Sequence, residues 1–258
     1  MVKRKTEPNR SVRSAKSDPK KGRTLVSVRR PSNRGGVRKN IGKTPSLKAG
    51  RPVWWESLLE RDYIVLLEFD PDVIAFVEQP FRVRYSFEGR VRHYTPDFLV
   101  ERKNKWQVVE VKSKEKASSE AFRLFRLSAE PEILKGTRKF MAADDERTCE
   151  FVVATEDKIR VQPRLENVKI LRGYARTPFL PGHAVLCRRF LRENEGASIA
   201  DLVAALSDGG ATLPVAYSLI YHGILVVDLN SPLDPQSVVW SAADANRRPA
   251  TGREEGRR

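Results

Sequence analysis

The sequence predicts an α/β fold in which helices flank a mixed sheet, followed by a small domain of short helices and two strands. Two observations carry this prediction. Strand-like segments follow one another closely between residues 81 and 111, with helical apolar spacing before and after them. From about Phe179 the apolar pattern changes to that of short helices. At 258 residues the chain has room for a mid-sized and a smaller domain, which we expect at 51–175 and 176–245.

The larger domain is expected to open with a helix over residues 54–69 that begins after Pro52. The apolar residues that recur at helical spacing in it are Trp55, Leu58, Leu59, Tyr63 and Leu66. Glu56 and Glu60 lie one turn apart on its flank. This helix can therefore bring a carboxylate beside the sheet, although acids on a helix flank ordinarily face water.

A run of short strands is expected to follow this helix. The expected strands lie at 81–87, 90–94, 98–102 and 106–111. Glu88 and Gly89 suit the turn of a hairpin between the first two. The remaining expected elements of this domain are a helical stretch within 116–140 that is interrupted near Pro131, a strand at 150–154 and a further strand near 168–171.

The C-terminal region has the element order of a winged helix. Three short helices are expected at 183–191, 198–206 and 212–221, and two strands at 223–228 and 237–240. Between Ala197 and Trp240 the sequence contains no lysine or arginine, so nothing there can neutralise phosphates or read guanine. We therefore expect this region to dock protein, or else to serve as a packing domain.

The two strands after the hairpin carry the residues that most strongly indicate chemistry. Pro96 and Asp97 stand at the start of the first strand, and Glu110 and Lys112 close the second, in a PD…ExK pattern. Glu110 and Lys112 share a face, because side chains alternate along a strand. The pattern is the signature of metal-dependent nucleases of the restriction-endonuclease type.

Placing Glu110 and Lys112 in a valine-rich strand is costly unless the charge is compensated. A hard divalent cation held by the carboxylates of Asp97 and Glu110 would compensate it. Lys112 would then sit beside the metal-bound water, which suits phosphodiester hydrolysis. The alternative is a hairpin with an ordinary cross-strand salt bridge.

Several short motifs together make residues 50–175 similar to TnsA, the endonuclease subunit of heteromeric transposases. These motifs are Glu56 to Asp62, Leu67 to Val73, Glu78 to Pro80, Tyr94 to Phe98 and Glu110 to Lys112. The resemblance implies a restriction-endonuclease-like fold that cleaves double-stranded DNA at the 5′ ends of a transposon in cut-and-paste transposition. It also implies two partners, a TnsB-like transposase that cleaves the 3′ ends and a TnsC-like ATPase that contacts the C-terminal domain.

Carried over residue by residue, the resemblance implies a catalytic set of Glu60, Asp97, Glu110 and Lys112. The acids Asp97, Glu110 and Glu60 would bind Mg²⁺, or Mn²⁺ in its place. Glu56 is a reserve candidate, since its place in the motif is not that of the catalytic acid of the family. Gln79 belongs to a Gln-Pro pattern and is expected either to line the site or to cap the strand that follows.

Most of the positive charge lies in the first fifty residues. The whole chain has a formal net charge of +15, and residues 1–50 hold 16 Lys and Arg against Glu7 and Asp18. With few apolar residues, this arm is expected to be largely flexible and to contact DNA phosphates, although its second half can order against the nuclease domain. The residues expected to bind DNA are Arg29, Arg30, Arg34, Arg38, Lys39, Lys43 and Lys48. A solubilising tail is the alternative.

Other features exclude several classes of protein. No run of about 18 apolar residues occurs, so a membrane protein is not expected. The two cysteines, Cys149 and Cys187, are too far apart to indicate a zinc motif or a disulfide framework. We expect a bacterial cytoplasmic protein associated with the nucleoid, with a disordered tail at 246–258. Two alternatives to a transposase endonuclease are a stand-alone restriction or repair nuclease and a non-catalytic DNA-binding scaffold.

Overall fold

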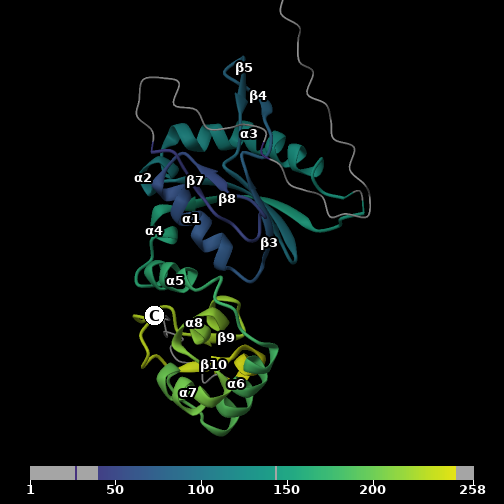
Figure 1. Cartoon of the computed structure of the whole chain (residues 1–258). Helices are drawn as coiled ribbons and strands as arrows, with labels where there is room; N and C mark the ends of the chain where they lie inside the picture. Colours follow the sequence, from purple (N-terminus) through teal and green to yellow (C-terminus); the bar gives the residue numbers. More distant parts are fainter. Residues whose placement is uncertain (1–26, 28–39, 143, 248–258) are drawn as a thin grey trace, which may run out of the picture.

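The computed structural model describes Ser27, residues 40–142 and residues 144–247. Figure 1 shows two stacked bodies, an α/β part (residues 42–173) above and a C-terminal part (residues 181–247) below. The predicted fold class is confirmed, because a mixed sheet lies between helices in the α/β part. This architecture is consistent with a restriction-endonuclease-like fold.

A four-stranded sheet forms the centre of the α/β part. Its order is β3 (Val73–Glu78), β6 (Phe98–Arg102), β7 (Lys105–Lys112) and β8 (Thr148–Thr155). The first three strands pair antiparallel, and β8 pairs parallel with β7. The strands predicted at 98–102, 106–111 and 150–154 are confirmed. The valine-rich segment of β7 is buried on both faces, because helices cover both faces of the sheet.

Two helices cover opposite faces of this sheet. Val109 of β7 packs in one core cluster with Ile64 of α1 (Leu58–Phe69). Its neighbour Val108 packs in another cluster with Ile133 of α3 (Glu120–Arg138). This division follows from the alternation of side chains along a strand.

The predicted start of the first helix is wrong. Residues 53–55 form β2 (Val53–Trp55), which pairs with β1 (Gly42–Thr44), and α1 begins only after Ser57. Ser57 Oγ accepts the N–H of Glu60 at 3.1 Å, and Glu60 Oε2 accepts the N–H of Glu56 at 2.8 Å. This reciprocal cap fixes the start of the helix at Ser57, so Pro52 does not open it.

The predicted hairpin is confirmed as β4 (Val83–Phe87) and β5 (Arg90–Tyr94). Glu88 and Gly89 both have positive φ, 50° and 69°, as a two-residue hairpin turn of the favoured twist requires. The hairpin is a sheet of its own and rises above the main sheet in Figure 1.

The predicted interruption of the next helix near Pro131 is wrong. α3 runs unbroken through Pro131, and the break falls earlier, between α2 (Lys114–Ala117) and the N-cap Ser119. A proline inside a helix costs about 3 kcal/mol through a lost hydrogen bond and a clash. The inner face of α3 offsets this cost, since Ala129 and Ile133 are fully buried on either side of the proline.

The strand predicted near 168–171 is also wrong. After α4 (Glu156–Ile159), this segment lies within α5 (Arg164–Gly173). Leu165, Val168 and Leu171 recur every third residue and are all buried, whereas Ile170 is exposed. This spacing is helical, and the short apolar run concealed it.

The elements predicted for the C-terminal part are confirmed in type and order. Its helices are α6 (Pro181–Glu193), α7 (Ile199–Ala205) and α8 (Leu213–Tyr221), and its antiparallel strands are β9 (Leu225–Val227) and β10 (Val239–Ser241). Two short 3₁₀ helices, η1 (Ser207–Gly209) and η2 (Ala242–Arg247), complete it. Its assignment as a winged helix stays a prediction.

The two parts share apolar packing. Leu171 of α5 belongs to the core cluster of the C-terminal part, and the ring of Phe69 at the end of α1 lies 5.9 Å from that of Tyr221 in α8. None of the helices in the described residues has the length and apolar character needed to cross a membrane.

Candidate active site

The predicted catalytic residues come together where three elements meet. Asp97 directly precedes β6, Glu110 and Lys112 close β7, and Glu60 lies in the first turn of α1. The N–H of Val111 donates to Asp97 Oδ2 at 2.7 Å, which ties the start of β6 to the end of β7. The antiparallel register, with Phe98 opposite Val109, puts the start of β6 beside the end of β7. These strand ends form one edge of the sheet, the strand edge that carries Asp97, Glu110 and Lys112.

Glu110 is the most buried member of the group, with 5% of its surface exposed. Both of its carboxylate oxygens have partners, because the hydroxyl of Tyr94 donates to Oε2 and the ammonium of Lys112 donates to Oε1. Part of the charge compensation that burial demands therefore comes from Lys112, through an ion pair within β7 and not through the cross-strand salt bridge of the alternative.

The acids also repel one another. Burial raises the pKa of Asp97 well above its ordinary value, and the charges of Glu110 and Glu60 raise it further. Burial likewise raises the pKa of Glu60, to which Glu56 and Glu110 add, while the N–H of Glu56 and the hydroxyl of Ser57 oppose the shift. Three carboxylates therefore act on one another at this edge, and nearby positive charge would favour their ionised forms.

The residues fit a hard divalent cation in their chemistry, since Asp97, Glu110 and Glu60 offer only oxygen ligands. The mutual repulsion of these carboxylates also favours a cation here, because a bound cation would relieve that repulsion. In the part of the chain that the structure describes, however, no three His, Cys, Asp or Glu side chains are grouped closely enough to hold a metal ion. Binding would therefore require the carboxylates to rearrange.

Gln79 links the two sides of the site. Its backbone N–H donates to the carbonyl oxygen of Asp97 at 2.8 Å, and its side-chain Nε2 donates to Glu56 Oε1 at 3.1 Å. The N–H of Glu56 in turn reaches Glu60 Oε2. Gln79 and Glu56 therefore form a hydrogen-bonded path from Asp97 to Glu60.

Two features of Gln79 set it apart. Its φ of 44° lies in the left-handed region, which costs a residue with a side chain about 1 kcal/mol or more. Its side-chain Oε1 is buried and has no hydrogen-bond partner among the described residues. Gln79 therefore lies between Asp97 and Glu56, and both expectations for it, that it lines the site or that it caps the next strand, β4 from Val83, stay predictions.

Sequence reasoning missed two aromatic contacts. Tyr94 touches Glu110, and its pKa is raised well above the ordinary value by burial and by the charges of Glu110 and Asp97. The Lys112 ammonium lies 5.0 Å from the ring centre of Phe122, where a cation–π attraction holds it. Tyr94 lies beside the Pro96-Asp97 motif, which was the available signal, whereas nothing near Lys112 in sequence indicated Phe122.

The predicted DNA-binding residues are only partly described. Lys43 lies over the ring of Trp54 at 4.2 Å. The ammonium of Lys48 donates to the carbonyl oxygens of Leu67 and Asp70 at the end of α1, and burial lowers the pKa of Lys48 to about 8. Lys48 therefore caps a helix in this structure. The residues of this set that lie outside the described part of the chain are Arg29, Arg30, Arg34, Arg38 and Lys39.

Other predictions for the chain ends can be compared in part. Within the arm predicted at 1–50, residues 42–44 are ordered as β1, in line with the expectation that its second half orders against the nuclease domain. Within the tail predicted at 246–258, Asn246 and Arg247 belong to η2, and the expected disorder of the tail stays a prediction. The rest of that tail, from residue 248, lies outside the described residues.

Fold and site together define a class of protein. A mixed sheet between helices, with acids and a lysine at one strand edge, is consistent with a restriction-endonuclease-like nuclease. Residues 70–156 match the family described as TnsA-like endonuclease N terminal, which supports the predicted TnsA-like assignment. The matched segment contains Asp97, Glu110 and Lys112 and begins after Glu60. No curated protein matches the chain. The family match indicates an endonuclease subunit of a transposase that acts on DNA.

Proposed function

We propose that the protein is a metal-dependent DNA endonuclease that hydrolyses phosphodiester bonds at the 5′ ends of a transposon. The observation that supports this most directly is the edge formed by Asp97, Glu110 and Lys112, which lies inside the segment matched to the endonuclease family. Glu60 joins this edge from α1 through its electrostatic interaction with Asp97 and Glu110.

Each candidate residue has a role in this proposal. Asp97, Glu110 and Glu60 would hold Mg²⁺ or Mn²⁺, which when bound supplies a water of lowered pKa and stabilises charge on the phosphate. Lys112 would orient the attacking water, and its positive charge would favour loss of a proton from that water, from a position fixed by Glu110 and the ring of Phe122. Gln79 and Glu56 would act as positioning residues that keep Asp97 and Glu60 in place.

We also propose that the subunit works with a TnsB-like transposase and that its C-terminal part contacts a TnsC-like ATPase. The lack of Lys and Arg from Ala197 to Trp240 supports protein docking over DNA reading by this part. A stand-alone restriction or repair nuclease is the second candidate function, and a requirement for the transposase partner distinguishes the two.

The proposal is tested by incubating the full chain with supercoiled transposon-end DNA and Mg²⁺, with and without the transposase partner. Asp97→Ala and Lys112→Ala are each expected to reduce cleavage strongly, by about 1000-fold for Lys112→Ala. Asp208→Ala and Lys103→Ala serve as matched controls, since both residues are exposed and lie away from this edge. Cleavage that survives both Asp97→Ala and Lys112→Ala would disprove the proposed site, and cleavage without the partner would favour a stand-alone nuclease.

A further inference from the structure

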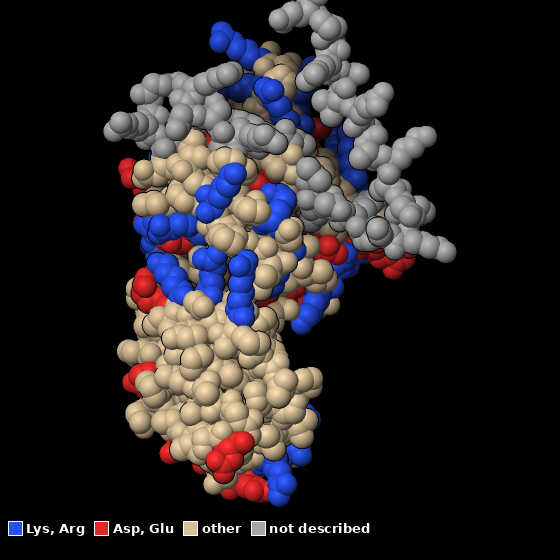
Figure 2. All heavy atoms as spheres, in the orientation of Figure 1, with Lys and Arg blue, Asp and Glu red and all other residues tan. Residues whose placement is uncertain are grey.

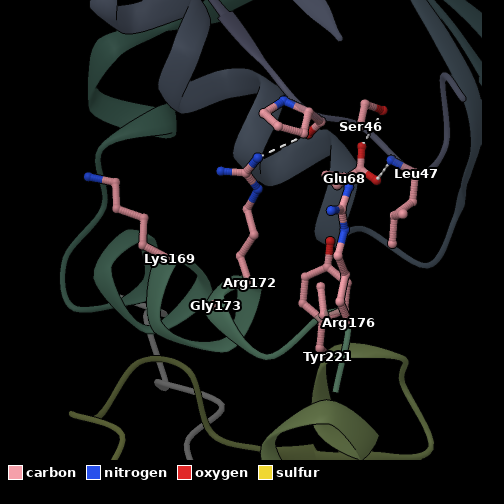
Figure 3. Close-up of a pocket in the computed structure, with 10 residues that line it drawn as sticks. Ser46, Leu47, Glu68, Lys169, Arg172, Gly173, Arg176 and Tyr221 are labelled. Atoms are coloured by element: carbon pink, nitrogen blue, oxygen red, sulfur yellow. Dashed lines mark hydrogen bonds between the residues drawn. The ribbon is translucent and has the colours of Figure 1, made fainter. Parts of the chain in front are cut away.

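A cavity of about 330 Å³ lies where the α/β part meets the C-terminal part (Figure 3). It is bounded by the end of α1, the segment before β2, α5 with the turn after it, and the last residue of α8. The residues that line it are Pro45, Ser46, Leu47, Glu68, Lys169, Arg172, Gly173, Ala175, Arg176 and Tyr221. No residue of the candidate active site is among them.

The charge of this cavity is mainly positive. Lys169 and Arg172 are three residues apart on α5 and so share one side of it, and Arg176 lines the same cavity from the turn after the helix. Glu68 is the single acid in the lining. In Figure 3, Arg172 extends from α5, and Arg176 from the turn after it, toward the end of α1 that carries Glu68.

Glu68 already accepts hydrogen bonds from three groups of its own neighbours. Its Oε2 accepts the hydroxyl of Ser46 at 2.6 Å, and its Oε1 accepts the N–H groups of Leu47 at 2.7 Å and Lys48 at 3.1 Å. Only 5% of Glu68 is exposed. This acid therefore holds the segment at 46–48 against α1 and leaves the arginines available to a ligand.

Several donors around the cavity are unused. Arg172 donates once, from Nη2 to the carbonyl oxygen of Pro45 at 3.0 Å, although a guanidinium has five N–H donors. Arg176 has no hydrogen bond or ion pair within the described residues, and the same holds for the hydroxyl of Tyr221. Burial raises the pKa of Tyr221 to about 12, so its hydroxyl stays a donor at neutral pH.

We propose that this cavity binds a phosphate group of the DNA backbone, through Arg172, Arg176 and the hydroxyl of Tyr221. Two guanidinium groups and a hydroxyl match the oxygens of a phosphate, and arginine forms paired hydrogen bonds with it. The identification of the ligand as DNA rests on the proposed function.

The surroundings of the cavity also favour DNA. Figure 2 shows a band of Lys and Arg across the lower edge of the α/β part, above a C-terminal part whose visible face is mostly uncharged. The C-terminal part contributes Tyr221 but has no Lys or Arg between Ala197 and Trp240, so α5 and the turn after it supply the positive charge of the cavity. Glu60 and Glu68 are eight residues apart on α1, roughly 12 Å along the helix axis. A duplex lying along α1 spans that distance in three or four base pairs, at about 3.4 Å each.

The test is DNA binding by the full chain, measured by fluorescence anisotropy of a short duplex over a range of salt concentrations. Each phosphate contact contributes about 0.9 to the slope of log K against log salt. Arg176→Gln is expected to reduce this slope by about one contact and to weaken binding about fivefold, and Tyr221→Phe to weaken it about twofold. Arg164→Gln, also exposed on α5 but outside the cavity, is the matched control and should change neither quantity.

Other outcomes separate this inference from the proposed function. If Arg176→Gln binds DNA like Arg164→Gln, the inference is overturned whatever the result of the cleavage assay. A third outcome is that inorganic phosphate raises the Tm of the wild type but not of Arg176→Gln, while Arg176→Gln binds DNA as tightly as the wild type. The cavity would then bind free phosphate, and the assignment of DNA as its ligand would be wrong. Weaker DNA binding by Arg176→Gln supports the proposed phosphate site in the cavity, whatever the cleavage assay shows. If Asp97→Ala then still cleaves DNA, only the proposed active site is disproved.

Discussion

The two ends of α1 carry sites of opposite electrostatic character. At its start, Glu60 joins Asp97 and Glu110, whose charges repel and raise the pKa of Asp97 and Glu60. At its end, Glu68 is held by three donors, and the arginines beside it have hydrogen-bonding capacity to spare. The first site would gain from a cation and the second from an anion. The acids at the start of α1 thus face other carboxylates, whereas Glu68 faces hydrogen-bond donors.

The strongest test of this contrast is the loss of Lys112. Lys112→Ala is expected to reduce cleavage by about 1000-fold, equivalent to roughly 4 kcal/mol of barrier, because it removes the group beside the nucleophile and leaves Glu110 without its ion-pair partner. Cleavage rates at saturating Mg²⁺ measure the effect. Lys112→Arg keeps the charge and serves as the comparison, and equal rates for wild type and Lys112→Ala would contradict the assignment.

The second test asks whether Glu68, at the other end of α1, stabilises the folded protein. Glu68→Ala is expected to lower the free energy of unfolding by about 3 kcal/mol, because it leaves the hydroxyl of Ser46 and two backbone N–H groups without their acceptor. Urea denaturation measures this change. Glu195→Ala, an exposed acid, should have an effect below about 0.5 kcal/mol. Similar values for the two variants would show that Glu68 is not a structural acid.

The third test concerns the path through Gln79. Gln79→Gly and Gln79→Asn both tolerate a positive φ but cannot bridge to Glu56, so each is expected to reduce kcat about tenfold, or ~1.4 kcal/mol. The KM for DNA and the Tm should stay near those of the wild type, because the backbone conformation is kept. A loss of Tm without a loss of kcat would assign Gln79 a purely structural role.

The smallest effect is expected from pH. Because folding raises the pKa of Asp97, its ionisation costs stability as pH rises above about 3.9, the ordinary pKa of an aspartate. Asp97→Asn removes this charge and can still accept the N–H of Val111, so it should raise the Tm at neutral pH by an amount that shrinks on acidification. Calorimetry over this pH range measures it. A Tm difference that is independent of pH would show that Asp97 is not destabilised by ionisation.

Sequence patterns predicted the parts of the fold that depend on near neighbours. The PD…ExK strands were found because a short turn joins them and alternation fixes which residues share a face. The hairpin at Glu88 and Gly89 was found for a similar local reason.

Contacts between distant segments could not be predicted in this way. Trp54 and Trp55 were assigned to a helix because their pairing partners, Lys43 and Gly42, lie in a separate segment that itself has no strong strand signal. The place of Gln79 beside Asp97 and Glu56 likewise depends on how β3 packs against α1. The unbroken α3 depends on burial around Pro131, which periodicity alone does not measure.

The ring contact between Phe69 and Tyr221 couples the position of α1 to that of α8. A helix of this length behaves as a stiff rod, so its two ends do not move independently. A displacement of α8, to which Tyr221 belongs, would be transmitted through Phe69 to Glu60, which lies nine residues earlier on the same helix. A partner that binds the C-terminal part and moves α8 would therefore also change the position of Glu60 relative to Asp97 and Glu110.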